Sequence, residues 1–460
     1  KDLSQKQRRD VERLVSRYKS IFTSDPGCTD VLEHKIELTT DEPFRVKQYP
    51  IPFAVRNDVS VEVEKMRKDG IIEASDSPYS SPIVIVKKKD GTNRFCIDFR
   101  TLNRVTLFDN EPMPTAEDIY AKLKGAKYFS KFDLTKGFWQ IPVRKEDQKK
   151  TAFTTAEGHF HFLRMPFGLV NATATFNRMM RIVLKDLPNV VSFVDDVLCF
   201  TQTWEDHMKV LEEVFRRLQH AKLTVKPSKC EIAFAAINFL GHRIDREHVR
   251  PQDENTQKIA RAPVPKTKSQ VRSFLGLAGF YREYIPHFAT IAAPLTRLTS
   301  KGQPNLVKWG REEEEAFRTL KELLTREPIL RTPDFSRPFI LQADASETGI
   351  GGALMQEFED GKFPVAYASK KLLPRESRYS VIERECLALV WSIKRFQKYL
   401  YGVNFILETD HKPLESLNRS KLNNSRVQRW ALELQNYRFH IRAINGKANV
   451  AADFLSRAEC

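Results

Sequence analysis

The sequence predicts a multidomain protein of the mixed α/β (α+β) class. Its 460 residues are enough for about three domains of ordinary size. Short apolar strands bounded by turn residues alternate with amphipathic helices along most of the chain. Apolar residues make up 41% of the composition and charged residues 29%, which is typical of a globular protein with a substantial core.

Net charge and cysteine spacing indicate the kind of partner and the cellular compartment. The chain carries 75 Lys and Arg against 59 Asp and Glu, so its formal net charge is +16. Such an excess favours a polyanionic partner, although solubility alone would also explain it. The six cysteines show neither metal-ligand spacing nor a disulfide framework, which indicates an intracellular protein. No membrane helix or secretory signal is evident, and both ends look cut from a longer chain.

The first part of the chain predicts a polar segment, a helix and a hairpin. Residues 1–35 are polar with one helical stripe, and a proline-rich extended stretch follows them. VRNDVSVEVEKMRKDG predicts a helix that stops at Gly70. SPIVIVKKKDGTNRFCIDF predicts two strands joined by a tight turn at Asp90-Gly91.

The next segment places acidic residues at strand ends. KYFSKFDLTKGFWQIPV predicts a strand that ends at Asp133, then a turn and a second strand. A strand, a Pro166-Phe167-Gly168 turn and a helix follow. VVSFV and VLCF then predict a hairpin with Asp195-Asp196 at its tip.

The second half begins with helices and returns to a mixed pattern. SQVRSFLGLAGFYREYI and REEEEAFRTLKELL predict helices, and TPDFSRPF (332–339) predicts a linker. The first of these helices has an apolar stripe at helical spacing, formed by Val271, Phe274, Leu275, Ala278 and Tyr281. Beyond it the pattern predicts strands and two long helices; the strands lie near 339–345, 351–356, 364–368, 404–410 and 438–444, and the helices near 378–400 and 425–436.

Paired carboxylates in an apolar setting require an explanation. Two adjacent charges repel by roughly 4 kcal/mol at about 4 Å in an effective dielectric near 20. Divalent cations relieve that repulsion, and hard oxygen ligands select Mg²⁺ or Mn²⁺. Two such ions can clamp the attacking and leaving oxygens of a phosphoryl transfer. Asp133 with Asp195-Asp196 is therefore a candidate metal site, although turn chemistry alone would explain either motif by itself.

A second set of acids lies in the C-terminal part. Asp344 and Asp410 end apolar strands, Asp453 lies in NVAADFLSR, and Glu385 lies on the predicted helix ERECLALVWSI. Helical periodicity puts Glu385 at the border of the apolar stripe and turns Glu383 toward solvent. Four such acids together indicate a second metal site more strongly than any one alone.

Six sequence blocks, in this order, resemble the reverse transcriptases of gypsy-type LTR retrotransposons. The blocks are VKKKDGTNRFCIDFRTLN, KFDLTKGFWQI, MPFGLVNATATF, SFVDDVLCF, LTVKPSKCEIAF and NFLGHRI. The four C-terminal acids resemble those of the ribonuclease H domain that follows these enzymes. The resemblance covers roughly residues 36–457 and implies a right-hand polymerase (fingers, palm, thumb) followed by a ribonuclease H-like α/β domain.

The resemblance also implies domain boundaries. Residues 1–35 would be an N-terminal extension or linker, 36–245 the fingers and palm, 246–335 the thumb, and 336–460 the ribonuclease H domain.

The resemblance assigns roles to particular residues. The catalytic and metal-binding carboxylates would be Asp133, Asp195 and Asp196 in the palm, and Asp344, Glu385, Asp410 and Asp453 in the ribonuclease H domain. The nucleotide-binding residues would be Lys88, Arg94, Phe138, Phe167, Gly168 and Lys229. The nucleic-acid-binding residues would be Phe193, Phe239, Leu240, Gly241, His242, Arg272, Gly276 and Arg282.

Three positions depart from the family pattern. Phe193 stands where tyrosine is frequent, so a hydroxyl contact near the primer is lost. Thr173 replaces a proline, which should soften the start of its helix slightly. The loop AINGKANVAAD lacks the histidine that many retroviral ribonuclease H domains carry, which puts the rate of product release in doubt.

The resemblance implies an enzyme with two activities. It would extend a primer 3′-OH with dNTPs on RNA and DNA templates, and it would cut the RNA strand of an RNA/DNA hybrid. Mg²⁺, or Mn²⁺ in its place, would act as cofactor with two ions per active site. The partners would be RNA/DNA hybrid, DNA duplex primer–template and dNTPs.

Several points stay open at this stage. The expected location is the cytoplasm, within retrotransposon particles, with the nucleus as a second location. One alternative is a non-catalytic nucleic-acid-binding subunit of a reverse transcriptase dimer, and a homodimer on the substrate is also open. An RNA-dependent RNA polymerase is a further rival, disfavoured by Phe138 at the steric-gate position and by the ribonuclease H acids.

Overall fold

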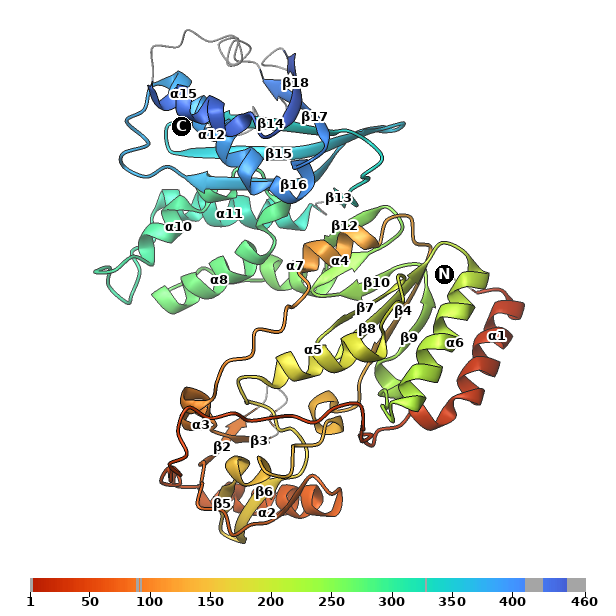
Figure 1. Cartoon of the computed structure of the whole chain (residues 1–460). Coiled ribbons are helices and arrows are strands. Elements are labelled where there is room, and N and C mark those ends of the chain that lie inside the picture. The colour runs from red at the N-terminus through yellow and green to blue at the C-terminus, as the bar shows by residue number, and fades with distance from the viewer. Residues whose placement is uncertain (1–2, 88–90, 92, 327–328, 410–424, 445–460) are drawn as a thin grey trace. The chain divides into compact units, whose positions relative to one another are not determined.

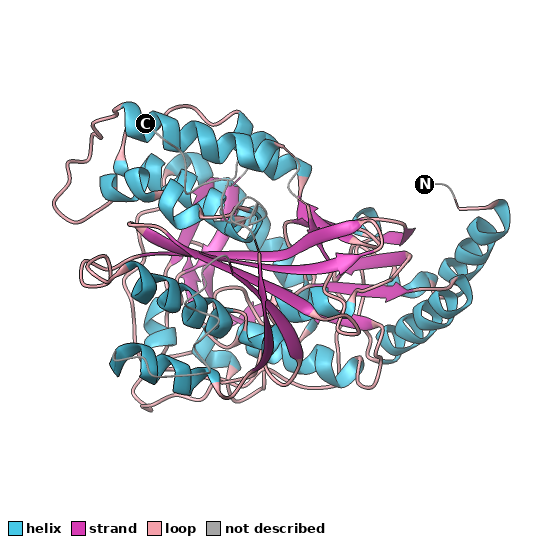
Figure 2. Ribbon diagram, turned by 90° about the horizontal axis from the view of Figure 1, so that it is seen from above, coloured by secondary structure: helices cyan, strands magenta, loops and turns pink. Residues whose placement is uncertain are grey.

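The computed structural model describes residues 3–87, 91, 93–326, 329–409 and 425–444 (Figure 1). The chain divides into two compact units, Lys1–Ile237 and Asn238–Cys460. Both units combine helices and strands (Figure 2), as the sequence predicts. Among the described residues, no helix is both long and apolar enough to cross a membrane.

An antiparallel sheet forms the centre of the first unit. Its strand order is β7-β8-β4-β9, and the strands are β4 (Tyr128–Asp133), β7 (Val190–Phe193), β8 (Asp196–Thr201) and β9 (Glu231–Phe234). Helices α5 (Ala172–Val183) and α6 (Trp204–His220) contribute buried side chains to the same core as the sheet. Phe132, Phe176 and Phe215 are fully buried there, because each falls on the apolar face of its element. This sheet carries the three acids of the palm motifs.

A second part of this unit contains shorter elements. Helix α2 (Phe53–Lys68) ends before Gly70, whose φ of +65° suits glycine. The remaining elements are α3 (Arg100–Val105), α4 (Ala116–Lys122), the short turns η2 (Gly137–Gln140), η3 (Gln148–Thr151) and η4 (Pro227–Lys229), and the sheet β1-β6-β5, formed by β1 (Ile72–Ala74), β6 (Gly158–Phe162) and β5 (Phe153–Thr155).

The two strands of the predicted basic hairpin are present. Strands β2 (Ile83–Lys87) and β3 (Asn93–Ile97) pair antiparallel, with Lys87 opposite Asn93. Residues 88–90 and 92, which include Asp90 of the predicted turn, lie outside the described residues. Gly91 has φ of +81°, which explains why glycine is needed at that position.

The N-terminal segment packs within the first unit instead of extending away as a linker. Helix α1 (Gln5–Arg17) begins at a Ser4 capping box, and Tyr18 packs edge-on against Phe215 of α6 at 5.9 Å. The turn η1 (Lys19–Ile21) follows, and the His34 amide then donates to the Pro142 carbonyl at 2.8 Å. Residues 4–35 therefore supply part of the core, which polar composition alone did not reveal.

The first part of the second unit is a small sheet with helices. The strand order is β10-β11-β12-β13, with β10 (Ile237–Phe239), β11 (His242–Ile244), β12 (His248–Pro251) and β13 (Leu330–Arg331). The helices are α7 (Asp253–Ala260), α8 (Lys268–Phe280), η5 (Arg282–Tyr284), α9 (Phe288–Ile291), α10 (Ala293–Leu298) and α11 (Arg311–Thr325). The predicted stripe of α8 is correct, because Val271, Phe274 and Ala278 are all buried.

The rest of the second unit is a five-stranded mixed sheet. Its order is β16-β15-β14-β17-β18, and the strands are β14 (Phe339–Ala345), β15 (Gly349–Phe358), β16 (Gly361–Lys371), β17 (Asn404–Thr409) and β18 (Arg438–Ala443). β14, β15 and β16 run antiparallel, whereas β17 is parallel to β14 and to β18. The helices α12 (Val381–Arg395), α13 (Gln397–Leu400) and α15 (Ser425–Leu434) match the predicted helical stretches.

The segment predicted as a linker between these two parts is packed. Thr332 and Asp334 are buried, and the Gln356 side chain bonds both the amide and the carbonyl of Asp334. The Arg331 guanidinium, 8% exposed, pairs with Glu247 at 2.6 Å and also with Asp360. The segment TPDFSRPF was predicted as a linker, but its first three residues, 332–334, are buried.

Candidate active sites

The register of the palm sheet brings three carboxylates to one end. Asp133 is the last residue of β4 and pairs directly with Asp196, the first residue of β8. Phe193 pairs with Asp196, so Val194 and Asp195 form the two-residue turn between β7 and β8. Val194 has φ of +49°, an unfavourable conformation for a β-branched residue. The tip that presents Asp195 is therefore held in a strained backbone, a feature often found at functional sites.

The electrostatics of this tip penalise its negative charge. Burial, together with Asp133 and Asp196, raises the pKa of Asp195 to about 6. Burial also raises the pKa of Asp196, against the opposing attraction of Lys131. The Oδ1 atom of Asp195 is buried and has no hydrogen-bond partner among the described residues. An added cation would relieve both penalties.

One lysine partly fulfils that need in this structure. The Lys229 ammonium lies 2.7 Å from Asp133 Oδ2, and this hydrogen bond raises the pKa of the lysine. Lys229 is the last residue of η4, which begins at Pro227, and the Lys226 amide donates to the Asp133 carbonyl. The predicted nucleotide-side lysine therefore lies directly beside the palm carboxylates.

The donor set at the tip fits a hard divalent cation. Asp133, Asp195 and Asp196 offer only carboxylate oxygens, the ligands that Mg²⁺ and Mn²⁺ prefer. Among the described residues, no three His, Cys, Asp or Glu side chains are already arranged around one point as a metal site. Lys229 takes one Asp133 oxygen.

A glycine makes room for the Asp195 carboxylate. A Cβ added to Gly137 would lie 2.5 Å from Asp195 Oδ1 and 3.0 Å from the Phe176 ring. Any side chain at Gly137 would therefore displace either the carboxylate or the core of α5. The glycine of the KGF triplet is needed for close approach and not for backbone freedom.

Aromatic rings form the wall beside the carboxylates. The Phe138 ring, 9% exposed, packs 5.1 Å from Phe167 and 5.7 Å from Phe176 between centroids. Phe167 is 40% exposed, and the Arg94 guanidinium lies 5.8 Å from its ring. The structure thus brings together Arg94, Phe138 and Phe167, as predicted for a nucleotide site. Lys88 lies outside the described residues.

The Phe167-Gly168 turn is clamped by an asparagine. Gly168 has φ of +93°, which only glycine adopts easily. The Asn103 side chain donates to the Gly168 carbonyl at 2.8 Å and accepts from the Val170 amide at 2.9 Å. Asn103 therefore fixes the conformation of this turn.

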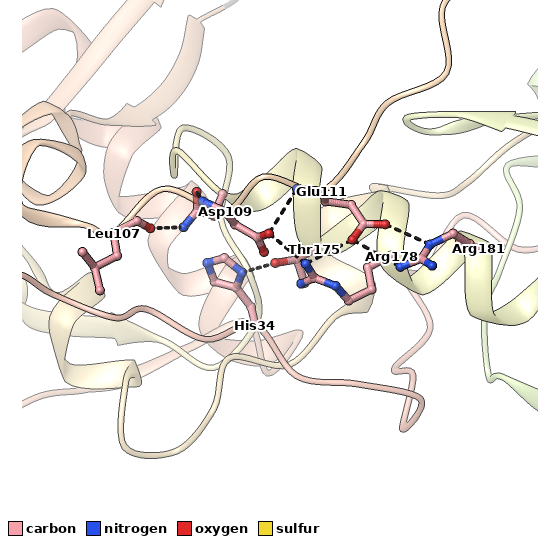
Figure 3. A network of polar contacts seen from close by, with 8 residues as sticks. His34, Leu107, Asp109, Glu111, Thr175, Arg178 and Arg181 are labelled. Atoms are coloured by element: carbon pink, nitrogen blue, oxygen red, sulfur yellow. Dashed lines mark hydrogen bonds and ion pairs between the residues drawn. The ribbon is translucent and has the colours of Figure 1, made fainter. Parts of the chain in front are cut away.

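A polar network ties α5, which follows this turn, to two extended segments (Figure 3). His34 is hydrogen-bonded to Thr175 on α5 at 2.8 Å, and burial lowers the pKa of His34 to about 4. Arg178 on the same helix lies 2.8 Å from Asp109 and 3.1 Å from Glu111. The N-terminal segment and residues 107–111 thus hold α5 against the palm.

The segment predicted to position the primer forms the β10–β11 turn in the second unit. Leu240 and Gly241 have φ of +48° and +79°. The Tyr281 hydroxyl donates to the Gly241 carbonyl at 2.6 Å, and the Asn255 amide donates to that hydroxyl at 2.9 Å. The His242 ring stacks on Tyr284 at 5.7 Å, and burial lowers the pKa of His242 to about 4. Phe239, the first residue of this predicted segment, is buried.

The predicted nucleic-acid residues of the thumb lie on its surface. Arg272 is exposed and donates to the Thr299 carbonyl at 3.1 Å, and Arg282 is exposed in η5. A Cβ at Gly276 would meet nothing within 4 Å, so this side of α8 is open.

The structure describes two of the four ribonuclease H acids. Asp344 lies near the end of β14 opposite Gly351, and Glu385 is partly buried on α12. The Arg384 guanidinium donates to the Ser346 carbonyl at 3.3 Å, so the start of α12 lies beside the end of β14. Asp410 and Asp453 lie outside the described residues.

The expectation that Glu383 points to solvent is wrong. Its side chain is 14% exposed, closes the capping box with Ser380, and pairs with Arg426 at 2.6 Å. Helical phase did not reveal this, because a cap and a cross-helix arginine hold the side chain.

Sequence reasoning missed three residues that shape these sites. Gly137 lies inside a recognised motif, and its meaning depends on where Asp195 lies in space. Asn103 ends a recognised block, but its role was not visible because both its partners are more than 60 residues away. Tyr281 was placed on the apolar stripe of α8, but the role of its hydroxyl was not visible.

Comparison with known proteins agrees with this arrangement. Residues 86–244 match the family model "Reverse transcriptase (RNA-dependent DNA polymerase)". Residues 334–437 match "RNase H-like domain found in reverse transcriptase". Fold and site together define a right-hand polymerase followed by a ribonuclease H-like domain.

Relatives narrow the family. The chain is 39% identical over 436 residues, 93% of its length, to the retrovirus-related Pol polyprotein from transposon 297 of Drosophila melanogaster, and covers 41% of that protein. It is 34% identical to the Pol polyprotein from transposon gypsy of the same species, with 97% of the chain and 45% of the relative covered. The chain thus spans less than half the length of these relatives. It belongs to the reverse transcriptase–ribonuclease H family of gypsy-type retrotransposon Pol polyproteins.

Solved structures support the same fold. The foamy viral protease-reverse transcriptase in complex with dsDNA aligns with a TM-score of 0.87 at 25% identity, covering 96% of this chain and 94% of that one. The same protein in complex with RNA/DNA hybrid aligns with a TM-score of 0.82 at 25% identity, covering 96% of this chain and 61% of that one.

Proposed function

We propose that the chain is an RNA- and DNA-dependent DNA polymerase with a ribonuclease H activity, acting in retrotransposon replication. It extends a primer 3′-OH with dNTPs and cleaves the RNA strand of RNA/DNA hybrids. The observation that carries the polymerase proposal is the buried, unpartnered Asp195 oxygen beside Asp133 and Asp196. A carboxylate kept in this state is expected where a cationic ligand completes the site.

The reaction assigned to the palm is a phosphoryl transfer. The primer 3′-oxygen forms a bond to the α-phosphorus of the dNTP, the bond from that phosphorus to the bridging oxygen breaks, and pyrophosphate leaves. The 3′-OH proton is released, and we assign Lys229 as the donor of a proton to pyrophosphate. Its ammonium already lies beside Asp133, which supports that role.

We propose Mg²⁺, or Mn²⁺ in its place, as cofactor with two ions per active site. Asp133, Asp195 and Asp196 would hold the ions in the palm, and Asp344, Glu385, Asp410 and Asp453 would hold them in the nuclease. When bound, such ions stabilise charge on the attacking and leaving oxygens. Binding in the palm would require Lys229 to release its Asp133 oxygen.

Other residues take positioning roles in this proposal. We assign Lys88 and Arg94 to the triphosphate, Phe167 and Gly168 to the nucleotide, and Phe138 to the exclusion of a ribose 2′-OH. Phe193 and residues 239–242 are assigned to the primer end. Arg272, Gly276 and Arg282 are assigned to the duplex, where arginines contact phosphates.

The proposed domains are fingers and palm at 36–245, thumb at 246–335 and ribonuclease H at 336–460. The packing of α1 on α6 argues for including residues 4–35 with the palm.

Primer extension on an RNA template labelled at its end tests both activities in one gel. Wild type with Mg²⁺ should give extended DNA and a shortened template. Asp195→Asn should lose extension alone, and Glu385→Gln should lose template cleavage alone. Neither product, despite tight hybrid binding, would refute the proposal.

The non-catalytic subunit is not favoured, since no described carboxylate of the palm set is replaced. A homodimer on the substrate is tested by sedimentation with added hybrid, where an unchanged monomer mass would exclude it.

The RNA polymerase rival is tested by Phe138→Ala, which should gain ribonucleotide incorporation. No gain would refute the steric-gate assignment.

A further inference from the structure

A cleft in the first unit contains a lysine that none of the assigned roles uses. The cleft has a volume of about 620 Å³ and lies between α2, the β2–β3 hairpin and the turn after β4. Lys136, Arg94, Trp139 and Phe167 line one side of it. Arg94 and Phe167 already belong to the proposed nucleotide site, so Lys136 faces the same space.

The backbone fixes Lys136 close to the palm carboxylates. Its φ of +48° and ψ of +50° start η2 in the left-handed region, an uncommon choice for lysine. The next residue, Gly137, lies so close to Asp195 that an added Cβ would be 2.5 Å from Oδ1. The Lys136 backbone is therefore held beside the residue at the tip of the β7–β8 hairpin.

The side chain of Lys136 is oriented by a ring. Its ammonium lies 4.5 Å from the Trp139 ring centroid, a favourable cation–π distance. The Trp139 amide donates to the Lys136 carbonyl at 2.8 Å, and the Trp139 ring lies 6.4 Å from Phe167. The Trp139 ring and this backbone bond thus hold the Lys136 ammonium on the side of the cleft that Trp139 and Phe167 line.

The cleft carries its positive charge on the wall that contains Lys136 and Arg94. Across the described residues, neither Lys136 nor Arg94 has a carboxylate within ion-pair distance. The acids that line the cleft are Asp58 and Glu62 on α2, and Asp58 already accepts from Asn93 at 2.6 Å. Two cations on one wall, one of them beside the metal-type carboxylates, fit an extended polyphosphate.

We infer that Lys136 binds the β- and γ-phosphates of the incoming nucleotide, as a further cation on the same wall as Arg94. This inference rests on the proposed polymerase function. Lys136 is a binding residue in this role: it contacts the substrate and takes no part in proton transfer. The leaving pyrophosphate carries the same groups, so Lys136 contacts that product as well.

Steady-state kinetics on poly(rA)/oligo(dT) with dTTP and Mg²⁺ test the inference. Lys136→Met keeps the aliphatic body against Trp139 and removes the charge. Its KM for dTTP should rise about tenfold, equivalent to about 1.4 kcal/mol. Its inhibition by pyrophosphate should weaken in parallel, while kcat and the KM for primer–template stay within about threefold.

Two further variants separate the contact from simple packing. Lys136→Arg retains the charge and should restore the KM for dTTP to near the wild-type value. Lys122→Met on α4 removes an exposed lysine of the same unit outside the cleft and should change nothing. A Lys136→Met enzyme with wild-type KM for dTTP would overturn the inference. A rise in the KM for primer–template alone would overturn it too, because it would assign the lysine to a template phosphate.

Binding without turnover distinguishes failure of the inference from failure of the proposed function. Calorimetric titration of dTTP with Ca²⁺ into the protein bound to a dideoxy-terminated primer–template measures affinity directly. Wild type should bind about tenfold more tightly than Lys136→Met. Equal affinities would overturn the inference even if wild type extends primers. A wild type that binds but does not extend would sink the proposed function alone.

Discussion

Two carboxylates with buried oxygens, one in each unit, lie in opposite electrostatic environments. Asp195 at the palm tip has one oxygen without a hydrogen-bond partner among the described residues, and its pKa is raised to about 6. Glu408 on β17 is 2% exposed, and Lys362 Nζ lies 2.8 Å from both its oxygens. Arg442 and Gln342 also donate to Glu408, at 3.0 and 2.6 Å.

The pKa directions show what this difference means. Burial pushes the pKa of Glu408 up, but its bonds from Lys362, Gln342 and Arg442 outweigh that and lower it. Burial and neighbouring acids act together to raise the pKa of Asp195, and the attraction of Lys229 offsets them only in part. A buried charge with its partners in the chain stabilises a fold, whereas one without them is available to an external ligand. On this basis we propose a structural role for Glu408 and a functional role for Asp195.

The largest expected effect follows from removing the Asp195 charge. Asp195→Asn should reduce primer extension by more than about a thousandfold, because the ligand that binds the cation is lost. Thermal stability should stay equal or rise by up to about 1 kcal/mol, since an unfavourable buried charge disappears. Primer-extension rates and calorimetric melting measure the two quantities. Loss of stability together with activity would make Asp195 structural and erase the contrast with Glu408.

Lowering the pH should reduce the folding stability of the palm unit through two buried histidines. Burial lowers the pKa of His34 and of His207 to about 4, so both are neutral when folded. Unfolded histidine takes up a proton near pH 6.5, so the unfolded state gains protons first as the pH falls. The free energy of unfolding is therefore highest above pH 6.5. It falls between pH 6.5 and about 4, by up to about 3 kcal/mol for each residue, as the unfolded histidines take up protons.

Urea denaturation at several pH values checks this acid response. The free energy of unfolding should fall steadily from pH 6.5 to 4. His220→Gln, which changes an exposed imidazole, should leave the profile as it is. A flat profile would show that these histidines are not held neutral by burial.

Removing the Glu408 charge should have the reverse pattern to Asp195→Asn. Glu408→Gln leaves Lys362 and Arg442 without their shared partner, which should cost about 2–3 kcal/mol of stability. The cost is moderated because these two cations are 30% and 43% exposed and can reach water. Primer extension should be unchanged, and Glu357→Gln at an exposed site of β15 serves as the control. A Glu408→Gln protein as stable as wild type would show that Glu408 does not have a structural role.

The smallest effect is expected at the Tyr281 hydroxyl. Tyr281→Phe keeps the buried ring but removes the bond to the Gly241 carbonyl. The turn at Leu240-Gly241 should loosen, and the KM for primer–template should rise about fivefold, equivalent to about 1 kcal/mol. The KM for dTTP should hardly change. Equal rises in both KM values would point to a general loss of folding.

Local patterns predicted much of this fold. The strand 339–345 matches β14, and the apolar stripe of α8 is buried as expected, because alternation and helical period report directly on burial. Asp133 and Asp195-Asp196 lie at strand ends as their flanking residues indicated. The pairing of Asp133 with Asp196 also shows that the two motifs share one sheet edge.

Features that depend on distant partners were not predictable from single stretches. The burial of residues 332–334 depends on Gln356, and the packing of α1 depends on Phe215. Glu383 has a cap and Arg426 as partners, which helical phase cannot show. The Asn103 clamp likewise exists only once the chain has folded.

Mg²⁺ binding measured by calorimetry tests the contrast most directly. An Asp344→Asn background weakens the nuclease site, so that the palm dominates the signal. In that background the account predicts Mg²⁺ binding that Asp195→Asn/Asp196→Asn abolishes and Glu408→Gln leaves intact. Mg²⁺ binding that persists unchanged without Asp195 and Asp196 would contradict the account.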